Sequence, residues 1–530
     1  DKIACFNYLY HLHDELLNHA QTEFNHFAQL KPMLDKFSEI TEYFKTVDET
    51  LDNCVHGHTS AKRQIKRIVG QWISGDNSKG YCIGFEGPPG VGKTTLAKEG
   101  LSRILQDDDG TYRPFSLIQL GGDSNGSSLS GHGYTYVGST WGSIVQILMD
   151  KKCMNPIILI DEVDKISKTE HGRELIGILT HMLDPSQNDS FQDKYFSGIN
   201  IDLSHVLFIL SYNDPNEIDK ILLDRVHRIT FEPLSIAEKI HVSKNNLIPF
   251  YETMFGLQNA FVFEDGVLEL LIDKYTQESG MHKLKELLYA IIGEINLEVL
   301  TNSAHTTFPR IIKPDDIQHK YLPDKHPINN QLIHRDDAVG IINCLFATTS
   351  GHSGILAATA KLVYSEKIFD LKLTGLLDEM MKESFHIAFT LAYGLLCDDH
   401  KQKLNSTHNE TKNVGIHMHM GDGSINKSGT SAGIAITVLL YSLLSDRKIK
   451  HDFAITGEAA DLSGTVGEIG ALKHKFLGGI KAGVKHFIFP QQNFQDYIAF
   501  ITKNENNPLI QGVTFHPVSH ISEVLDLIIV

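Results

Sequence analysis

The 530-residue chain is short of basic residues and of paired cysteines. Its 48 Lys and Arg against 65 Asp and Glu give a net charge of −17, which argues against a surface that coats nucleic acid. The six cysteines are scattered and form no C-x-x-C pair, so a reduced, intracellular protein is the simpler prediction. The 28 histidines include no H-E-x-x-H sequence, and their number therefore does not indicate a zinc enzyme.

Long hydrophobic runs are also missing. No apolar run reaches the ~18–20 residues of a membrane span, and the longest candidate, residues 432–444, carries small residues and is predicted to be a core helix. The chain begins at Asp1 rather than Met, so we expect a fragment or processed form whose targeting signal lies out of view. The expected compartment is the cytoplasm, with an organelle matrix as the alternative and no membrane partner.

One stretch matches the phosphate-binding pattern G-x-x-x-x-G-K-[ST]. It is Gly87-Pro88-Pro89-Gly90-Val91-Gly92-Lys93-Thr94. An apolar run precedes it and a helix start follows it, which is the strand–loop–helix context that the pattern needs. Glycines let backbone N–H groups cradle phosphate oxygens at the positive end of the helix. Lys93 is expected to reach the outer phosphates of ATP, and the Thr94 hydroxyl to ligate Mg²⁺.

Five short apolar runs are predicted to be strands. They are residues 81–85, 115–120, 156–160, 206–211 and 228–231. Because they alternate with helical segments, they indicate an α/β domain with a parallel sheet covered on both faces. Ligands bind at the carboxyl ends of such strands.

Polar residues follow two of these strands, and an arginine precedes the last one. Asp161 is expected near Mg²⁺ and Glu162 beside the attacking water, the alternative being an exposed acidic strand end. Asn213 is placed to hold the same water, although Asn before Asp214-Pro215 also suits a simple turn. Arg225 would be an ordinary helix-end charge in a monomer, and only an oligomeric ring would let it reach a neighbour's nucleotide.

The remaining segments give a domain order. A helical N-terminal arm is expected over residues 1–48, a large α/β domain over 49–236, an all-helical lid over 237–322, a charged linker over 323–337 and an α+β domain over 338–530. The glycine-flanked aromatics of residues 131–138 fit either a mobile loop that presents a side chain to a partner or a loop packed on the core.

Two features of the last domain are candidates for a metal site or a catalytic site. His417 and His419 share one face of a strand at residues 414–420, where a metal pair is less expected than two histidines lining the strand. Ser431 precedes an apolar helix, where free N–H groups would stabilise an oxyanion, but ordinary N-capping is the favoured reading. No Ser-His-Asp spacing is present. A lysine base from residues 471–477 would need burial to lower its pKa by several units.

Together these stretches resemble the ATP-dependent Lon proteases, which are AAA+ serine peptidases. The resemblance rests on the phosphate loop and on several further segments: Gly131-His132, Thr135-Tyr136-Val137-Gly138, residues 155–165, 183–188 and 202–204, Thr374-Gly375, residues 381–384 and 431–434, Thr456-Gly457-Glu458 and residues 472–475. It implies an AAA+ module with a helical lid, followed by a Lon-type peptidase domain.

The resemblance also assigns roles to residues. Ser431 would be the nucleophile and Lys473 the general base, rather than Ser428, Thr430 or Lys475, with Thr456 orienting the lysine. Tyr136 and Val137 would form a substrate-gripping pore loop, Arg225 an arginine finger, and Asn213 the sensor 1 residue. The family assembles as hexameric rings, so a homohexamer that binds ATP and Mg²⁺ is implied.

Some positions depart from the family pattern. His282 occupies the position of the sensor 2 arginine, with Lys283 as a substitute, and Trp141 replaces a proline near the pore loop. The family's large N-terminal substrate-recruiting domain is expected to be missing or to lie outside this fragment. We expect an ATP-driven protease of unfolded or damaged proteins; the alternatives are an AAA+ unfoldase or chaperone with an inactive peptidase domain and, disfavoured by charge, a nucleic-acid-remodelling ATPase.

Overall fold

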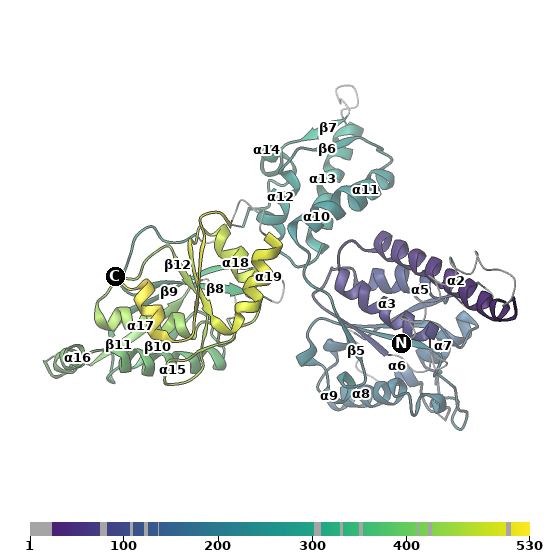
Figure 1. Cartoon of the computed structure of the whole chain (residues 1–530), viewed down its shortest axis with the longest axis horizontal. Coiled ribbons are helices and arrows are strands. Elements are labelled where there is room, and N and C mark those ends of the chain that lie inside the picture. Colours follow the sequence, from purple (N-terminus) through teal and green to yellow (C-terminus); the bar gives the residue numbers. More distant parts are fainter. Residues whose placement is uncertain are drawn as a thin grey trace. The chain divides into compact units, whose positions relative to one another are not determined.

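The computed structural model divides the chain into two compact units, one ending at Ile248 and the other beginning at Pro249 (Figure 1). We describe each unit by itself. The structure describes residues 24–74, 82–106, 110–120, 126–135, 137–301, 309–328, 332–348, 353–410, 413–421, 427–504 and 510–530, with the side chains of 24–37, 405–410 and 503 left aside.

A parallel five-stranded sheet organises the first unit. Its strands are β1 (Cys82–Glu86), β2 (Phe115–Gln119), β3 (Ile157–Asp161), β4 (Leu207–Tyr212) and β5 (His227–Thr230), in the order β2-β3-β4-β1-β5. All neighbours pair in parallel. The five predicted strands are therefore confirmed to within about a residue at either end. Because β3 and β4 are almost wholly buried, their carboxyl ends meet at one edge of the sheet.

Helices cover this sheet. They are α3 (Thr59–Ser74), α4 (Lys93–Thr95) with its continuation η1 (Leu96–Leu101) and α5 (Ser102–Ile104), α6 (Ser127–Ser130), α7 (Ser143–Lys151), α8 (Glu170–Leu183) and α9 (Lys220–Leu223), with short 3₁₀ turns η2 (Val163–Lys165), η3 (Asn188–Ser190) and η4 (Pro215–Glu217). Apolar residues of β3, β4, α7 and α8 form one core. This is the α/β architecture expected from alternating apolar strands and helices.

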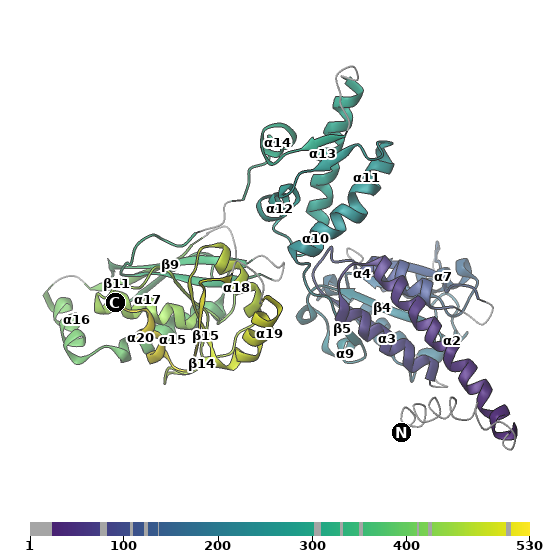
Figure 2. The same cartoon turned by 45° about the horizontal axis from the view of Figure 1, so that its top comes forward.

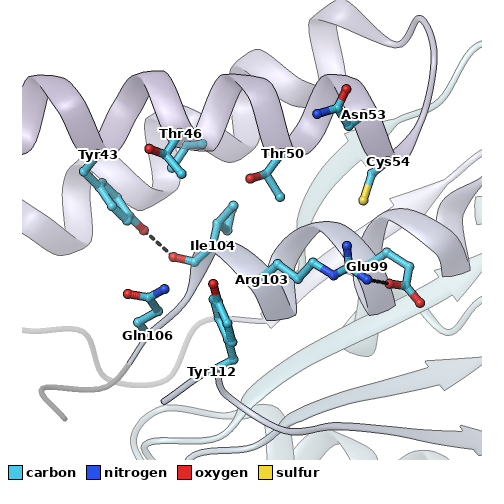
Figure 3. Close-up of a pocket in the computed structure, with 11 residues that line it drawn as sticks. Tyr43, Thr46, Thr50, Asn53, Cys54, Glu99, Arg103, Ile104, Gln106 and Tyr112 are labelled. Carbon is cyan, nitrogen blue, oxygen red and sulfur yellow. Dashed lines mark hydrogen bonds and ion pairs between the residues drawn. The ribbon is translucent and has the colours of Figure 1, made fainter. Parts of the chain in front are cut away.

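The N-terminal helix α2 (Phe24–Cys54) continues through the boundary predicted at residues 48/49. Val47 and Leu51 on its last turns are buried, and the Tyr43 hydroxyl donates to the carbonyl oxygen of Ile104, at 2.5 Å. Between α2 and the helix that follows the phosphate loop lies a cavity of about 550 Å³, crossed on one side by the Arg103–Glu99 ion pair (Figure 3). None of its lining residues belongs to the phosphate loop.

The segment predicted to be an all-helical lid is not entirely helical. Its helices are α10 (Ile236–Val242), η5 (Ser243–Leu247), α11 (Ile248–Phe255), α12 (Val267–Leu271), η6 (Ile272–Thr276), α13 (His282–Thr301), α14 (Pro314–Asp316) and η7 (Ile317–Tyr321). The strands β6 (Phe261–Phe263) and β7 (Arg310–Ile312) add a parallel pair. Helices α11 and α13 lie side by side (Figure 2), and the Tyr251 hydroxyl donates to the Lys285 carbonyl oxygen at 3.1 Å.

A mixed seven-stranded sheet organises the C-terminal domain. Its strands are β8 (Ile341–Ala347), β9 (Ser353–Tyr364), β10 (Leu371–Thr374), β11 (Val414–Met420), β12 (Phe453–Ile455), β15 (His486–Pro490) and β16 (Thr514–Val518), in the order β10-β11-β9-β8-β12-β15-β16. β9 is antiparallel to both its neighbours, and the other pairs are parallel. A two-stranded sheet pairs β13 (Glu458–Ala459) with β14 (Val466–Gly467).

Alternate residues of this mixed sheet lie on opposite faces and pack into two separate hydrophobic cores. The helices are α15 (Glu379–Leu395), α16 (Asp398–Glu410), α17 (Gly433–Ser445), α18 (Leu472–Lys481), η8 (Gln491–Asn493), α19 (Phe494–Asn504) and α20 (Ile521–Ile528). One core joins α15, α17 and α20 to the sheet, and the other joins α18 and α19 to it (Figure 1). The expected α+β domain is confirmed.

The contact between α18 and β9 yields a stability prediction. A Cβ built on Gly478 would lie 2.4 Å from backbone atoms of Ser353 and Gly354, whereas one on Gly394, in α15, meets nothing within 4 Å. Gly478→Ala should therefore destabilise this domain by about 1–3 kcal/mol, and Gly394→Ala should stabilise it by about 0.5–1 kcal/mol. Hydrogen exchange of the α18 and β9 amides measures both; equal protection in the two variants would contradict the packing described.

Candidate active sites

The phosphate loop adopts the backbone that its glycines permit. Gly87, Gly90 and Gly92 have φ values of 151°, 78° and 102°, in a range that residues with a Cβ rarely adopt. A Cβ on Gly87 would also lie 2.4 Å from the carbonyl oxygen of Phe231. Gly92 precedes α4, so the loop delivers an anion to the positive end of the helix formed by α4, η1 and α5. The fold therefore suits phosphate at this loop.

Lys93 is buried beneath the loop and its ammonium group is fully surrounded by oxygens. It donates to the carbonyl oxygens of Gly87 and Tyr212, the latter at 2.9 Å, and to Asn213 Oδ1 at 2.8 Å. Burial lowers the pKa of Lys93 to about 8, against the opposing charges of Asp161, Asp164 and Glu86. A bound phosphate adds negative charge, which favours the ammonium form.

Asp161 and Glu162 lie where the sequence predicted, at the carboxyl end of β3. Asp161 is half-buried and its Oδ1 accepts the Glu162 N–H at 2.9 Å, which leaves Oδ2 without a hydrogen bond among the described residues. Glu162 is exposed with φ of 59°, a left-handed conformation that is uncommon outside glycine. The half-buried Thr94 supplies a hydroxyl. Carboxylate and hydroxyl oxygens are ligands that Mg²⁺ accepts, so the donor set fits that ion.

Asn213 comes directly after β4 and joins the same site. Its side chain accepts from Lys93, and its backbone N–H donates to Asp164 Oδ2 at 3.1 Å. The structure thus brings Lys93, Asp161 and Asn213 to one edge of the sheet. Asp164 also lies there, and sequence reasoning gave it no role.

Arg225 is held within its own protomer. Its guanidinium pairs with Asp184 at 3.2 Å, and its Nη1 donates to the Ile221 carbonyl oxygen at 2.9 Å. Both charged residues line a surface cavity of about 410 Å³. The pair is partly exposed, and such pairs contribute at most about 1 kcal/mol. A stronger anion can therefore displace Asp184 from the arginine.

The structure describes some of the residues assigned to the pore loop and to sensor 2. Val137 is fully exposed, whereas Tyr136 lies outside the described residues. The half-buried Trp141 packs edge-on against Tyr195, with ring centroids 5.7 Å apart. His282 begins α13 and is exposed. Nucleotide sensing by His282 stays a prediction.

Ser431 lies one residue before the cap of α17. The N-cap is Ala432, so ordinary capping by Ser431 is not what the structure shows. Ser431 is half-buried, and its carbonyl oxygen accepts the Gly457 N–H at 2.8 Å and the Thr456 hydroxyl at 3.3 Å. The segment that follows β12 therefore fixes the backbone of Ser431.

The choice of Lys473 over Lys475 needs correction. Lys473 is exposed on α18, whereas Lys475 is only 4% exposed and donates from Nζ to Thr456 Oγ1 at 3.0 Å. Burial lowers the pKa of Lys475 to about 8. Positions 473 and 475 lie about 200° apart around a helix, so only one of them can face Thr456.

A helical pattern in the sequence contained this information. Leu472 and Phe476 are spaced i, i+4 and both are buried on α18, and Lys475 lies on the same stripe at i+3. Lys473 falls outside the stripe. Weighing the two lysines against the apolar face would have selected Lys475.

The histidine pair lies on β11, where both side chains contact Thr374. His417 Nε2 and His419 Nδ1 lie 3.1 and 2.9 Å from Thr374 Oγ1. The two side chains share a face of the strand as expected. No group of three or more His, Cys, Asp or Glu that could hold a metal ion occurs among the described residues.

Comparison with known proteins matches both units to families. Residues 83–234 match the ATPase family associated with various cellular activities (AAA), and residues 312–530 match the Lon protease (S16) C-terminal proteolytic domain. The chain belongs to the Lon protease family. The AAA match lies inside the predicted 49–236 domain, and the proteolytic match begins within the predicted lid.

Individual Lon relatives are similar along most of the chain. A Lon protease homolog of Acanthamoeba polyphaga mimivirus is 32% identical over 94% of this chain and 53% of its own length. The Lon protease of Campylobacter jejuni is 35% identical over 90% and 56%, and that of Endomicrobium trichonymphae 30% identical over 96% and 62%. The chain thus spans little more than half of these relatives. Among the described residues, no helix is long and apolar enough to cross a membrane.

The burial of Lys475 predicts a pH-dependent stability difference. Its pKa is about 8 in the folded chain against 10.5 ordinarily, so folding opposes the charged form. The penalty is complete below pH 8 and disappears as pH rises toward 10.5. Lys475→Met should therefore stabilise the domain by up to about 3 kcal/mol at pH 7 and by much less at pH 9.5, in urea unfolding followed by circular dichroism.

The exposed Lys473 provides the matched control. Lys473→Met removes the same charge from the same helix, and we expect a change within about 0.5 kcal/mol at both pH values. A larger, pH-dependent effect at position 473 than at 475 would reverse the correction.

Proposed function

We propose that the chain is the ATPase and peptidase portion of an ATP-dependent serine endopeptidase with a Ser431–Lys475 dyad. One observation supports it above all: the buried Lys475 bonds to Thr456, and Thr456 bonds to the backbone of Ser431. A lysine whose pKa is lowered to about 8 by burial is suited to act as a general base. In this proposal Lys475, and not Lys473 as the family resemblance implied, is the general base.

Thr456 restricts how the lysine can act. Its hydroxyl proton is engaged with the Ser431 carbonyl oxygen, so towards Lys475 it is an acceptor only. A neutral lysine amine has two protons and one lone pair. With one proton directed to Thr456, the lone pair of the amine remains available to accept the Ser431 proton.

The chemical steps then follow the usual logic of a serine nucleophile. Lys475 removes the Ser431 proton as Oγ attacks the peptide carbonyl carbon, and the C–N bond breaks as the lysine returns that proton to the leaving amine. Water hydrolyses the acyl-enzyme, with Lys475 again accepting a proton. The end of α17 beside Ser431 provides N–H groups for the oxyanion.

The AAA module would supply the driving force. In this proposal the Gly87–Thr94 loop and Lys93 bind the ATP phosphates, Thr94 and Asp161 hold Mg²⁺, and Glu162 and Asn213 orient the attacking water. The ion supplies charge neutralisation at the phosphates. Arg225 would exchange Asp184 for a neighbouring protomer's phosphate.

Assembly and substrates complete the proposal. A homohexameric ring gives each Arg225 a neighbouring nucleotide and lets Tyr136 and Val137 contact the substrate; His282 and Lys283 would sense nucleotide from the lid. The substrates are unfolded or damaged proteins, which would reach Ser431 by translocation. An unfoldase or chaperone with an inactive peptidase domain is the alternative, and the buried dyad lysine disfavours it.

The dyad assignment predicts a selective loss of proteolysis. Ser431→Ala and Lys475→Ala should each reduce cleavage of a short peptide at least 10³-fold while ATP hydrolysis stays within twofold. Lys473→Ala, on the exposed face of α18, should cleave the peptide at close to the wild-type rate. Wild-type cleavage by Ser431→Ala, or loss in Lys473→Ala alone, contradicts the assignment.

The pKa of Lys475 predicts the pH profile of the same reaction. Only the neutral amine accepts a proton, so log kcat/KM for an ATP-independent short peptide should rise with slope one up to about pH 8 and then level off. Lys475→Arg, which stays charged, should be inactive across this range. A profile that is flat between pH 6.5 and 8.5 would argue against a lysine base.

Coupling between the two activities gives a further test. Glu162→Gln keeps the shape of the side chain but removes the carboxylate that polarises water, so ATP should bind without turnover. Degradation of a folded substrate should stop while cleavage of a short peptide continues. Equal loss of both would mean that ATP gates the peptidase itself.

A further inference from the structure

Asp164 is a buried carboxylate in the nucleotide site with an unusual set of partners. It is only 8% exposed and lies in η2, the 3₁₀ turn that begins directly after Glu162. Its Oδ2 accepts the backbone N–H groups of Asn213 and Asp214, at 3.1 and 3.3 Å. Its Oδ1 is buried without a hydrogen bond among the described residues.

The location explains why these N–H groups need an acceptor. β4 ends at Tyr212, and a chain leaving a parallel sheet has no neighbouring strand to pair with. Asp164 lies beyond β3, which pairs with β4. One carboxylate oxygen therefore replaces the ladder partner for two residues and fixes the direction in which Asn213 leaves the sheet.

The same carboxylate connects the loops that carry two predicted functional residues. On the β3 side, Asp164 lies two residues after Glu162, which has a left-handed backbone conformation. The Lys165 N–H donates to the Glu162 carbonyl oxygen at 2.9 Å and closes this turn around Asp164. On the β4 side, Asp164 holds Asn213, whose side chain accepts from Lys93 at 2.8 Å. Asp164 thus joins the Glu162 turn, the Asn213 turn and, through Asn213, the phosphate-loop lysine.

An acceptor whose role was only to hold the loop would not have to be a carboxylate. A serine hydroxyl or an asparagine carbonyl can accept backbone N–H groups without bringing a buried charge. The unpaired Oδ1 makes the carboxylate more unfavourable still, and unpaired buried polar groups in native proteins call for an explanation such as a functional role. Charged acceptors form hydrogen bonds about twice as strong as neutral ones, which suits a loop whose side chain must be held in place.

We infer that Asp164 is a positioning residue for ATP hydrolysis, which holds the Asn213 loop and the Glu162 turn in register at the adjoining ends of β3 and β4. It acts through Asn213 and does not touch the nucleotide. This inference rests on the proposed role of Asn213 in hydrolysis. It predicts that loss of Asp164 impairs turnover more than binding.

Steady-state ATP hydrolysis by the full chain tests the inference. Asp164→Ala should lower kcat at least tenfold, with the KM for ATP within threefold of wild type, because Asn213 is released while the glycine backbone of the phosphate loop and the Lys93 contacts with Gly87 and Tyr212 remain. Asp164→Asn should lower kcat only about threefold, because its carbonyl oxygen can accept the same two N–H groups but forms weaker hydrogen bonds than the carboxylate. Asp164→Glu should lose at least fivefold, because an added methylene displaces the carboxylate.

A double-mutant cycle with Asn213 separates an indirect role from a general one. If Asp164 acts through Asn213, Asp164→Ala/Asn213→Ala should hydrolyse ATP within twofold of Asn213→Ala alone. Multiplied losses, or a KM increase that accounts for the loss, would overturn the inference. Where Asp164→Ala does not fold, the contrast between Asp164→Asn and Asp164→Glu decides, and equal loss in both overturns it.

Two controls make a failure interpretable. Asp202 is exposed and its Oδ1 accepts the Ser204 N–H at 2.8 Å, before the start of β4. Asp202→Asn removes the same charge from the same domain and should hydrolyse ATP within twofold of wild type; a loss equal to that of Asp164→Ala would overturn the specific role. If Asn213→Ala itself hydrolyses ATP normally, the proposed role of Asn213 fails, and the inference with it.

Discussion

Burial of a lysine ammonium group is the physical constraint on which both sites depend. Burial brings the pKa of Lys93 and that of Lys475 to about 8, but their surroundings differ. Lys93 has three oxygen acceptors and three carboxylates that oppose the shift, and a bound phosphate would add negative charge that favours its ammonium form. For Lys475 burial is the sole cause of the shift, and its one described acceptor is Thr456, so the neutral form is within reach for proton transfer. Burial of a lysine therefore contributes to phosphate binding at one site and to proton transfer at the other.

Features encoded in short stretches were predictable from the sequence. The five strands of the first sheet are short runs of four to six residues, and their ends appear within about a residue of the prediction. The phosphate loop is a local pattern whose glycines are needed at their positive φ values. Asp161 and Asn213 could be placed because Asp161 ends one buried strand and Asn213 directly follows another, and carboxyl ends of parallel strands share an edge. In each case neighbouring residues alone determine the outcome.

Features that depend on which face is buried were harder. Lys473 and Lys475 stand in the same helix within the same apolar surroundings, and only the packing of α18 against β9 decides which one meets Thr456. The pair β6–β7 joins segments about 50 residues apart by three residues each, too short for a periodic signal. Asp164 escaped notice because its function lies in hydrogen bonds to a loop 49 residues away, which a sequence pattern does not contain.

The two sites share one structural solution. In the first unit a lysine at the start of α4 donates to Asn213, the first residue beyond the buried strand β4. In the second, a lysine in α18 donates to Thr456, the first residue beyond the buried strand β12. The backbone N–H of Asn213 is paired with Asp164 Oδ2, and that of Thr456 with the Ile488 carbonyl oxygen of β15. The side-chain oxygen of each residue is therefore left for the lysine, and the strand behind it is buried. Such a position can take a buried ammonium group and hold it to within the tolerance that phosphate binding or proton transfer demands. The mixed sheet of the second domain contains parallel neighbours on both sides of β12, and this arrangement, rather than the overall fold class, makes the second lysine site a counterpart of the first.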